Sequence, residues 1–274
     1  IQNEQGGRYS KRKVSYGPPT LYCSLESELK NGRTVCIVSD NSWKYSPSSI
    51  TFNSIYGGED EDARITSSWK PVVIQKGPRG VLRQQIAQPV KMMEYFGVKS
   101  RHQLTPQQIA KASNAKHPIP AGTFVLAMGQ NLAGFPQIKV SGKAGQQVRL
   151  YLSETLTAQG TCNQKQSGSP YYLNYTLSGK GEKASDGKRI ETWHPHFTYY
   201  GYRYIQVEGA VMKGDENPDG KPVIEDIQSC FVYNSAAKIG SFECSNPMFN
   251  RAYLIIDRAI RSNRQAVWTD CPHR

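Results

Sequence analysis

The residues with the greatest potential for chemistry stand at the end of the chain, in the run WTDCPHR at positions 268–274. Asp270 and His273 supply an acid and a base, and Cys271 is a potential metal ligand. Such a cluster of titratable groups is typical of a site that binds or transforms a polar ligand. Its geometry depends on the elements that lead into it, so the upstream sequence decides what the run does.

A long amphipathic helix is predicted immediately before this run. Ser245 or Asn246 provides the N-cap and Pro247 occupies the start of the helix. One helix cannot bury its own apolar stripe, so we expect the chain to be truncated near the start of a larger helical domain. The apolar stripe comprises Phe249, Ala252, Tyr253, Ile256, Ala259 and Ile260, and the charged residues off it are Arg251, Asp257, Arg258 and Arg261.

The region before residue 238 is predicted to be mainly β. Short strands with few helices between them, separated by Gly, Pro, Asn and Ser, are typical of a β-sandwich. One short helix is predicted over 104–111, with Thr105 as its cap and Pro106 at its first position. The predicted strands of this region cover 123–128, 135–141, 147–153, 171–177, 202–208 and 227–234.

The chain divides into four parts by this pattern. Residues 1–20 form a polar, basic, flexible tail, and 21–71 form a portion of a first β-domain. In that portion, strands over 21–26 and 34–38 flank an Asn-Gly turn at 30–33. A β-sandwich domain covers 72–237, and 238–274 begin the helical domain.

An acidic run, Glu59-Asp60-Glu61-Asp62, suggests either a calcium loop or an exposed acidic loop. Calcium loops alternate their ligands and include a turn glycine, which four consecutive acids do not do. We therefore favour an exposed loop in which one carboxylate pairs with Arg64.

Six aromatic residues between Trp193 and Tyr204 suit either the stacking of sugar rings or a sandwich core. We expect core packing for most of them. His194 and His196 alternate like a ligand pair on a strand, but the sequence shows no third ligand, so no metal is predicted.

Composition excludes several classes of protein. The net charge is +12, but Lys and Arg are spread along the chain, so a solvated basic surface is favoured over nucleic-acid binding. No apolar run reaches the ~18 residues of a membrane span. Cysteines stand at 23, 36, 162, 230, 244 and 271 without a C-x-x-C pair, so a zinc-binding cysteine site is not favoured. Cys23–Cys36 or Cys230–Cys244 pairing and free thiols all stay open.

Four motifs in order resemble the bacterial α-L-rhamnosidases, glycoside hydrolase family 78. GGEDEDAR at 57–64 resembles the family's G-E-x-Y-D-A-R run, with Glu61 in place of the usual tyrosine. GQNLAG at 129–134 and FTYYGYRY at 197–204 resemble its next β-sandwich. SFECSNP at 241–247, a helix and TDCPHR at 269–274 resemble the beginning of its catalytic domain.

The resemblance implies a fold of two β-sandwich domains followed by the first helix of a truncated (α/α)6 barrel. It implies a glycosidase that removes terminal α-L-rhamnose from plant glycosides or polysaccharides with inversion and without a cofactor. Asp270 and Arg274 would bind the rhamnose, while Cys271 and Pro272 shape the turn after the helix. The general acid would be a Glu directly after Arg274 and the base a later Glu, so no catalytic residue lies within the chain and we expect these 274 residues alone to be inactive.

The alternative is a non-catalytic carbohydrate-binding β-sandwich protein with the helix as an appendage, which the aromatic cluster supports. A nucleic-acid partner has only the charge in its favour. The family's extracellular plant substrates suggest a periplasmic or secreted location. The sequence leaves the aglycone, the linkage and the oligomeric state open.

Overall fold

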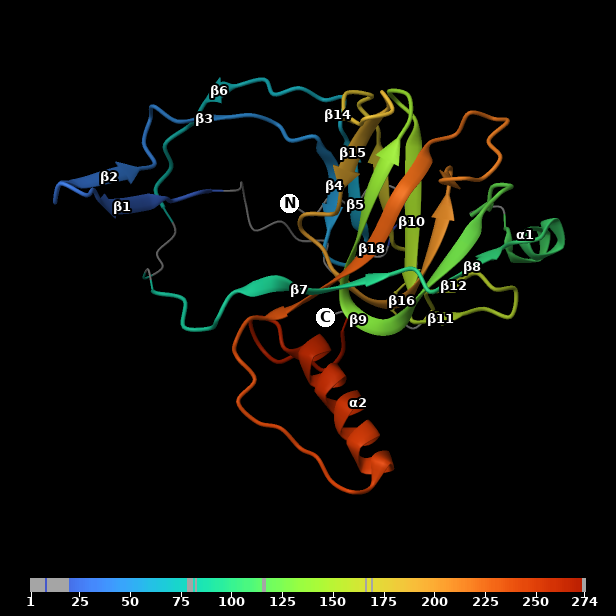
Figure 1. Ribbon diagram of the computed structural model, residues 1–274. Coiled ribbons are helices and arrows are strands. Elements are labelled where there is room, and N and C mark those ends of the chain that lie inside the picture. Colours follow the sequence, from blue (N-terminus) through green and yellow to red (C-terminus); the bar gives the residue numbers. More distant parts are fainter. Residues whose placement is uncertain are drawn as a thin grey trace.

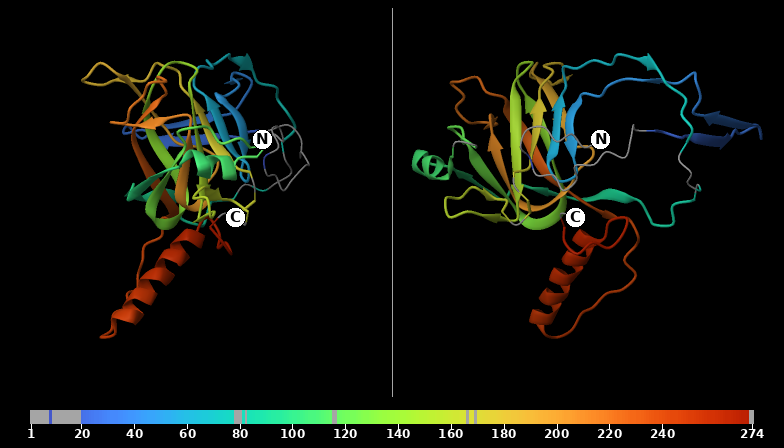
Figure 2. Two further views of the ribbon diagram at one scale, coloured as in Figure 1. Left: turned by 90° about the vertical axis from the view of Figure 1, so that its right-hand side faces the viewer. Right: turned by 180° about the vertical axis from the view of Figure 1, so that it is seen from behind.

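The computed structural model describes Arg8 and residues 20–77, 81, 83–114, 117–165, 167–168 and 170–272. The described part is mostly strand with two α-helices, which confirms the mainly β prediction. Figures 1 and 2 show a compact β body from which a small hairpin and the second helix project. The strands are β1 (Ser24–Glu28), β2 (Thr34–Val38), β3 (Lys44–Tyr45), β4 (Ile50–Ser54), β5 (Gly58–Asp62), β6 (Lys70–Pro71), β7 (Val90–Gly97), β8 (Ser100–Gln103), β9 (Phe124–Ser141), β10 (Gln147–Ser153), β11 (Thr155–Leu156), β12 (Cys162–Asn163), β13 (Tyr172–Thr176), β14 (Glu182–Lys183), β15 (Arg189–Trp193), β16 (Tyr200–Glu208), β17 (Val211–Met212) and β18 (Val223–Asn234).

Strand β9 joins the two halves of the β body. Its beginning pairs with β8 and β16, whereas its end pairs with β15 and β18. The sequence predicts two strands here, but the chain runs through the Gly-rich motif as one long strand with a register shift opposite Tyr202/Tyr204. At Gly134 the neighbouring strand comes so close that a Cβ would lie 1.9 Å from the Cys230 carbonyl oxygen. Only glycine permits this approach.

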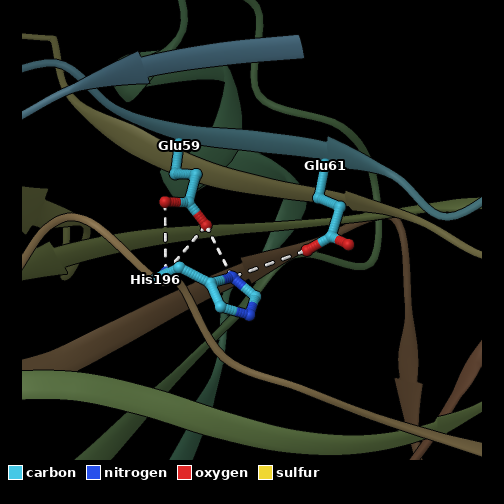
Figure 3. A group of neighbouring side chains, drawn as sticks. All are labelled: Glu59, Glu61 and His196. Atoms are coloured by element: carbon cyan, nitrogen blue, oxygen red, sulfur yellow. Dashed lines mark hydrogen bonds and ion pairs between the residues drawn. The ribbon is translucent and has the colours of Figure 1, made fainter. Parts of the chain in front are cut away.

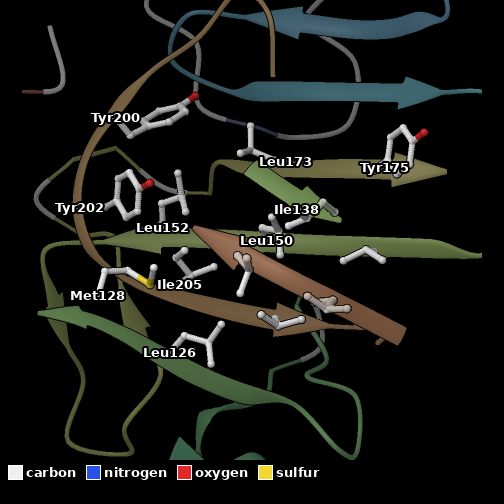
Figure 4. Close-up of a cluster of buried hydrophobic side chains, with 14 of the residues drawn as sticks. Leu126, Met128, Ile138, Leu150, Leu152, Leu173, Tyr175, Tyr200, Tyr202 and Ile205 are labelled. Atoms are coloured by element: carbon white, nitrogen blue, oxygen red, sulfur yellow. The ribbon is translucent and has the colours of Figure 1, made fainter. Parts of the chain in front are cut away.

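The core lies between the faces of this folded sheet (Figure 4). Alternating residues of β9, β10 and β16 supply it, as the period of a strand requires. The largest fully buried side chains are Tyr171, Tyr202, Phe124, Phe231, Leu126, Met128, Leu132, Ile138, Leu150, Leu152, Leu173 and Leu177.

The predicted hairpin near the N-terminus is confirmed, since β1 and β2 pair antiparallel around a turn in which Gly32 has φ of 78°. Most of its residues are exposed. Strand β5 instead joins the large sheet through parallel pairing with β13. The division of the chain at residue 71 stays a prediction, and the structure adds that β4 and β5 extend the sheet that follows it. Of the predicted tail 1–20, only Arg8 and Thr20 lie within the described residues.

Both predicted helices form. Helix α1 (Pro106–Ala112) has Thr105 as its N-cap, in a capping box with Gln108. Helix α2 (Pro247–Asn263) has Asn246 as its N-cap, whose side chain accepts from the Met248 amide. In the described part of the chain, neither helix is long and apolar enough to cross a membrane.

Helix α2 leaves its apolar stripe uncovered by the described residues. Phe249 is 54% exposed and Ile256 57%. The helix contacts the β body through charged residues instead. Glu94 of β7 accepts from Arg258 at 2.6 Å and from Arg261 at 2.9 Å, and it also accepts from the Tyr233 hydroxyl of β18 at 3.0 Å.

Removing this carboxylate should loosen α2 without disturbing the β core. We expect Glu94→Gln to cost about 1–2 kcal/mol of docking free energy, because charged hydrogen bonds contribute about 1.5–3 kcal/mol and partial exposure weakens them. Amide exchange in the second half of α2 should rise roughly tenfold. Glu182→Gln, on the exposed β14, is the matched control. Equal exchange in both variants would contradict this account of docking.

The same contact predicts a pH dependence. Burial acts to raise the pKa of Glu94, but hydrogen bonds from Arg258 and Tyr233 outweigh it and hold the pKa below its ordinary 4.5. A carboxyl with a lowered folded-state pKa stabilises the docked helix fully above pH 4.5 and loses this contribution as the pH falls through the folded-state value. The difference in α2 amide protection between wild type and Glu94→Gln should therefore shrink on acidification. A difference that grows would contradict the assignment.

Candidate functional site

Residues 268–272, the described part of the end run (268–274), lead to the β body, where Pro272 lies beside the beginning of β16. The backbone bends through residues 270–272, with Asp270 exposed and Cys271 and Pro272 half-buried. His273 and Arg274 lie outside the described residues, so the sugar-binding role of Arg274 stays a prediction. Asp270, the other predicted substrate-binding residue, is placed at the surface where a ligand has access.

Pro272 packs on Gly201. A Cβ at Gly201 would lie 2.7 Å from the Pro272 Cβ and 3.3 Å from Glu154 Oε1. The same Glu154 oxygen accepts from Asn131 Nδ2 at 2.7 Å. Three of the motifs, those containing Asn131, Gly201 and Pro272, therefore meet at one place although they are far apart in sequence.

Glu154 is a site residue that sequence reasoning missed. It follows β10 directly and is half-buried, so a carboxylate lies near the end run in addition to Asp270. No local motif marks it. The only available signal is an acid at the end of a clear alternating strand, and many surface acids share that position.

An aromatic cleft of about 660 Å³ lies next to this meeting point. Tyr199 lines the cleft and is a neighbour of Cys271 in the end run. Burial, and then the proximity of Cys271, raise the pKa of Tyr199. Phe197, at 64% exposed, presents its ring to solvent there. The cleft is also lined by Tyr56, Tyr95, Phe135 and His196. Aromatic faces beside polar groups suit a sugar ring or a planar organic group.

The aromatic motif itself divides between core and surface. Trp193, Tyr200 and Tyr202 are buried in the core, as expected for most of the motif. Tyr199 and Tyr204 are half-buried. Of the six aromatic residues, Phe197 is the one with a largely exposed ring, as stacking on a sugar requires.

The exposed acidic loop predicted at 59–62 is wrong, because these residues form β5 in the large sheet. Because successive side chains of a strand point to opposite faces, Glu59 and Glu61 share one face of β5 and Asp60 and Asp62 share the other. Glu59 is fully buried, and both it and Glu61 contact His196 (Figure 3). Asp60 forms a 2.6 Å ion pair with Arg8, and the predicted pairing with Arg64 is confirmed at Asp62, at 2.7 Å.

Glu59 fastens β5 to the segment that leads into β16. Its carboxylate accepts from the backbone amides of His196 at 2.9 Å and Phe197 at 3.0 Å. Asn53 Nδ2 donates to it at 3.1 Å. A buried carboxylate is tolerated only when its lone pairs are occupied in this way. The clamp thereby sets the backbone that continues to Tyr199 and Gly201.

All six cysteines lie within the described residues, and each is a free thiol. The two pairings that the spacing left open are therefore not formed. Burial raises the pKa of the Cys162 thiol to about 12 and that of Cys230 to about 11, which makes both poor nucleophiles.

Comparison with known proteins places the chain in context. Residues 2–94 match the α-L-rhamnosidase N-terminal domain, 117–233 the bacterial α-L-rhamnosidase concanavalin-like domain, and 237–274 the bacterial α-L-rhamnosidase 6 hairpin glycosidase domain. An α-L-rhamnosidase of Formosa agariphila is 29% identical over 97% of this chain and 26% of its own length.

Solved structures agree. The α-L-rhamnosidase from Dictyoglumus thermophilum matches with a TM-score of 0.72 at 26% identity, over 92% of this chain and 26% of that one. The Streptomyces avermitilis enzyme complexed with L-rhamnose matches with a TM-score of 0.69 at 26% identity, over 92% of this chain and 23% of that one. The chain thus spans about a quarter of these relatives. With three successive family matches and this shared fold, the chain belongs to the bacterial α-L-rhamnosidases, glycoside hydrolase family 78, and corresponds to their N-terminal region.

Proposed function

We propose that this chain is the N-terminal part of an inverting α-L-rhamnosidase that hydrolyses terminal α-L-rhamnose from plant glycosides or polysaccharides. The observation that carries the proposal is the packing of the end run on Gly201, beside the Asn131–Glu154 hydrogen bond. This packing supports a role for the β body in holding Asp270 where a sugar reaches it. A periplasmic or secreted location is part of the proposal, because such polymers lie outside the cell.

Inversion requires two carboxyl groups with different tasks. A protonated one donates to the leaving oxygen, and an ionised one activates water from the opposite face, with about 6.5–9.5 Å between them. Asp270 is a single, exposed carboxyl group and cannot perform both tasks at once. It suits hydrogen bonding to the sugar hydroxyls better than proton donation. In the proposed mechanism, a Glu directly after Arg274 is the acid and a later Glu is the base.

The second candidate function is non-catalytic sugar binding by the β body. The cleft lined by Phe197 and Tyr199 favours it, since exposed aromatic rings beside His196 suit the apolar face of a sugar. The two functions are separable because one needs a pair of carboxyl groups and the other needs only the cleft.

The assay that tests these functions uses the 274-residue chain with an aryl α-L-rhamnoside. We expect no release of the aryl alcohol above the buffer rate, because the two Glu residues proposed as acid and base are not among these 274 residues. A calorimetric titration with L-rhamnose then separates the candidates. Weak binding that Phe197→Ala abolishes would favour the sugar-binding function, whereas turnover well above background would contradict the proposed division of roles.

Placement of Asp270 should depend on the glycine beneath Pro272. Gly201→Ala adds a Cβ that meets the rigid proline ring, so the end run must shift at a cost of about 1–3 kcal/mol. We expect amide exchange over 266–271 to rise roughly tenfold or more while the core strands β9 and β10 keep their protection.

Gly97→Ala is the matched control, since a Cβ there meets nothing within 4 Å. If Gly201→Ala exchanges like this control, Pro272 does not depend on the contact and the proposed positioning of Asp270 fails.

A further inference from the structure

Two carboxylates and one imidazole converge beside the aromatic cleft, which His196 also lines. Glu59 and Glu61 point from the same face of β5 toward His196, which lies in the segment before β16 (Figure 3). One ligand atom from each residue can be chosen so that all three lie within 4.8 Å of one another. Glu59 and His196 are 137 positions apart in sequence, which explains why the sequence shows only two histidines without a third ligand.

The distances fit a shared cation better than direct hydrogen bonds. His196 Nδ1 lies 3.4 Å from Glu59 Oε1 and 3.8 Å from Glu61 Oε2. Good N–H···O bonds have distances of about 2.7–3.2 Å. Ligands about 2.0–2.2 Å from a tetrahedral zinc ion are about 3.3–3.6 Å from each other. Small side-chain adjustments therefore place all three atoms around one ion.

Both carboxylates are already oriented by donors outside the cluster. Phe197 N and Asn53 Nδ2 donate to Glu59. Trp193 Nε1 donates to Glu61 Oε2 at 2.7 Å, and Ser49 Oγ donates to its other oxygen at 2.8 Å. Outer hydrogen bonds of this kind orient metal-ligating carboxylates. The cluster thus has fixed ligands with a supporting shell, which an exposed acidic patch lacks.

Charge gives a second, independent reason. Glu59 has no exposed surface and the side chain of Glu61 is 14% exposed. Among the described residues, neither carboxylate forms an ion pair with a lysine or arginine, and His196 is the only ionisable cation beside them. Carboxylates in buried surroundings are commonly paired with a cation or bound to a metal. A divalent ion neutralises both.

We propose that Glu59, Glu61 and His196 bind one divalent transition-metal ion, with zinc as the representative. An imidazole nitrogen with two carboxylates suits zinc, whereas calcium prefers six to eight oxygen ligands. The side chain of His196 is 47% exposed, which leaves a path for the ion and a place for water as the fourth ligand. The role is structural: the ion ties β5 to the segment that carries Tyr199 and Gly201.

The test is a calorimetric Zn²⁺ titration of the 274-residue chain after alkylation of its accessible thiols. We expect one saturable site and a Zn²⁺-dependent rise in Tm, because the ion binds the folded state. His196→Gln removes the imidazole but keeps the backbone amide that Glu59 accepts from, so the fold should persist. Its Zn²⁺ affinity should be at least about tenfold weaker.

His194→Gln is the matched control. Its ring stacks on Phe135 and its Nδ1 lies 2.9 Å from the Pro195 carbonyl oxygen, outside the cluster. It should bind Zn²⁺ as wild type does, and Glu61→Gln should bind like His196→Gln. Co²⁺ substitution should give the visible absorption of a tetrahedral site in wild type and His194→Gln, but not in His196→Gln or Glu61→Gln. No saturable binding by wild type, or equal affinity in wild type and His196→Gln, would overturn the proposal.

Discussion

The structure depends on the double pairing of β9. The first half of this continuous strand pairs with β8 and β16, and its second half pairs with β15 and β18. The sheet therefore folds over and encloses a core. Gly134 makes this possible, because the β18 backbone passes where a side chain would stand. Every later feature of the site is placed by strands that pair with β9 or with its neighbours.

A buried charge then connects the sheet to the site. Glu59 belongs to β5, which enters the sheet beside β13, and it accepts the amides of the segment before β16. A carboxylate without exposed surface cannot exchange these partners for water, so the clamp is strong where a surface hydrogen bond would be weak. Residues from the first third of the chain thereby determine where Tyr199 and Gly201 stand, and Gly201 determines where Pro272 rests.

The features that the sequence predicts well are local. Each of these features depends on a few neighbouring residues, and each is confirmed: the cap of α1 by Thr105 and Gln108, the start of α2 at Asn246 and Pro247, and the hairpin at the Asn-Gly turn. The prediction of an exposed loop for the acidic run was wrong because four adjacent acids are typical of a solvated loop. These residues form a strand by pairing with β13, and Glu59 contacts His196; both partners lie far along the chain. Glu154 was missed for the same reason. Long-range pairing assembles this site, and one sequence contains no signal of it beyond family resemblance.

Helix α2 shows how a helix with an uncovered apolar stripe still holds the end run in place. In addition to the Glu94 contacts, hydrogen bonds fix the residues that directly follow the helix. Gln265 Nε2 donates to the Val232 carbonyl at 3.1 Å, and the Asn234 amide donates to the Arg264 carbonyl at 2.8 Å. These bonds join the chain after the helix to the end of β18. The position of Asp270 therefore follows from β18 and β16, both partners of β9, and does not require the stripe to be covered. The β body thus holds Asp270, the carboxylate proposed to bind the sugar, even though the helix before it belongs to the region that matches the glycosidase domain.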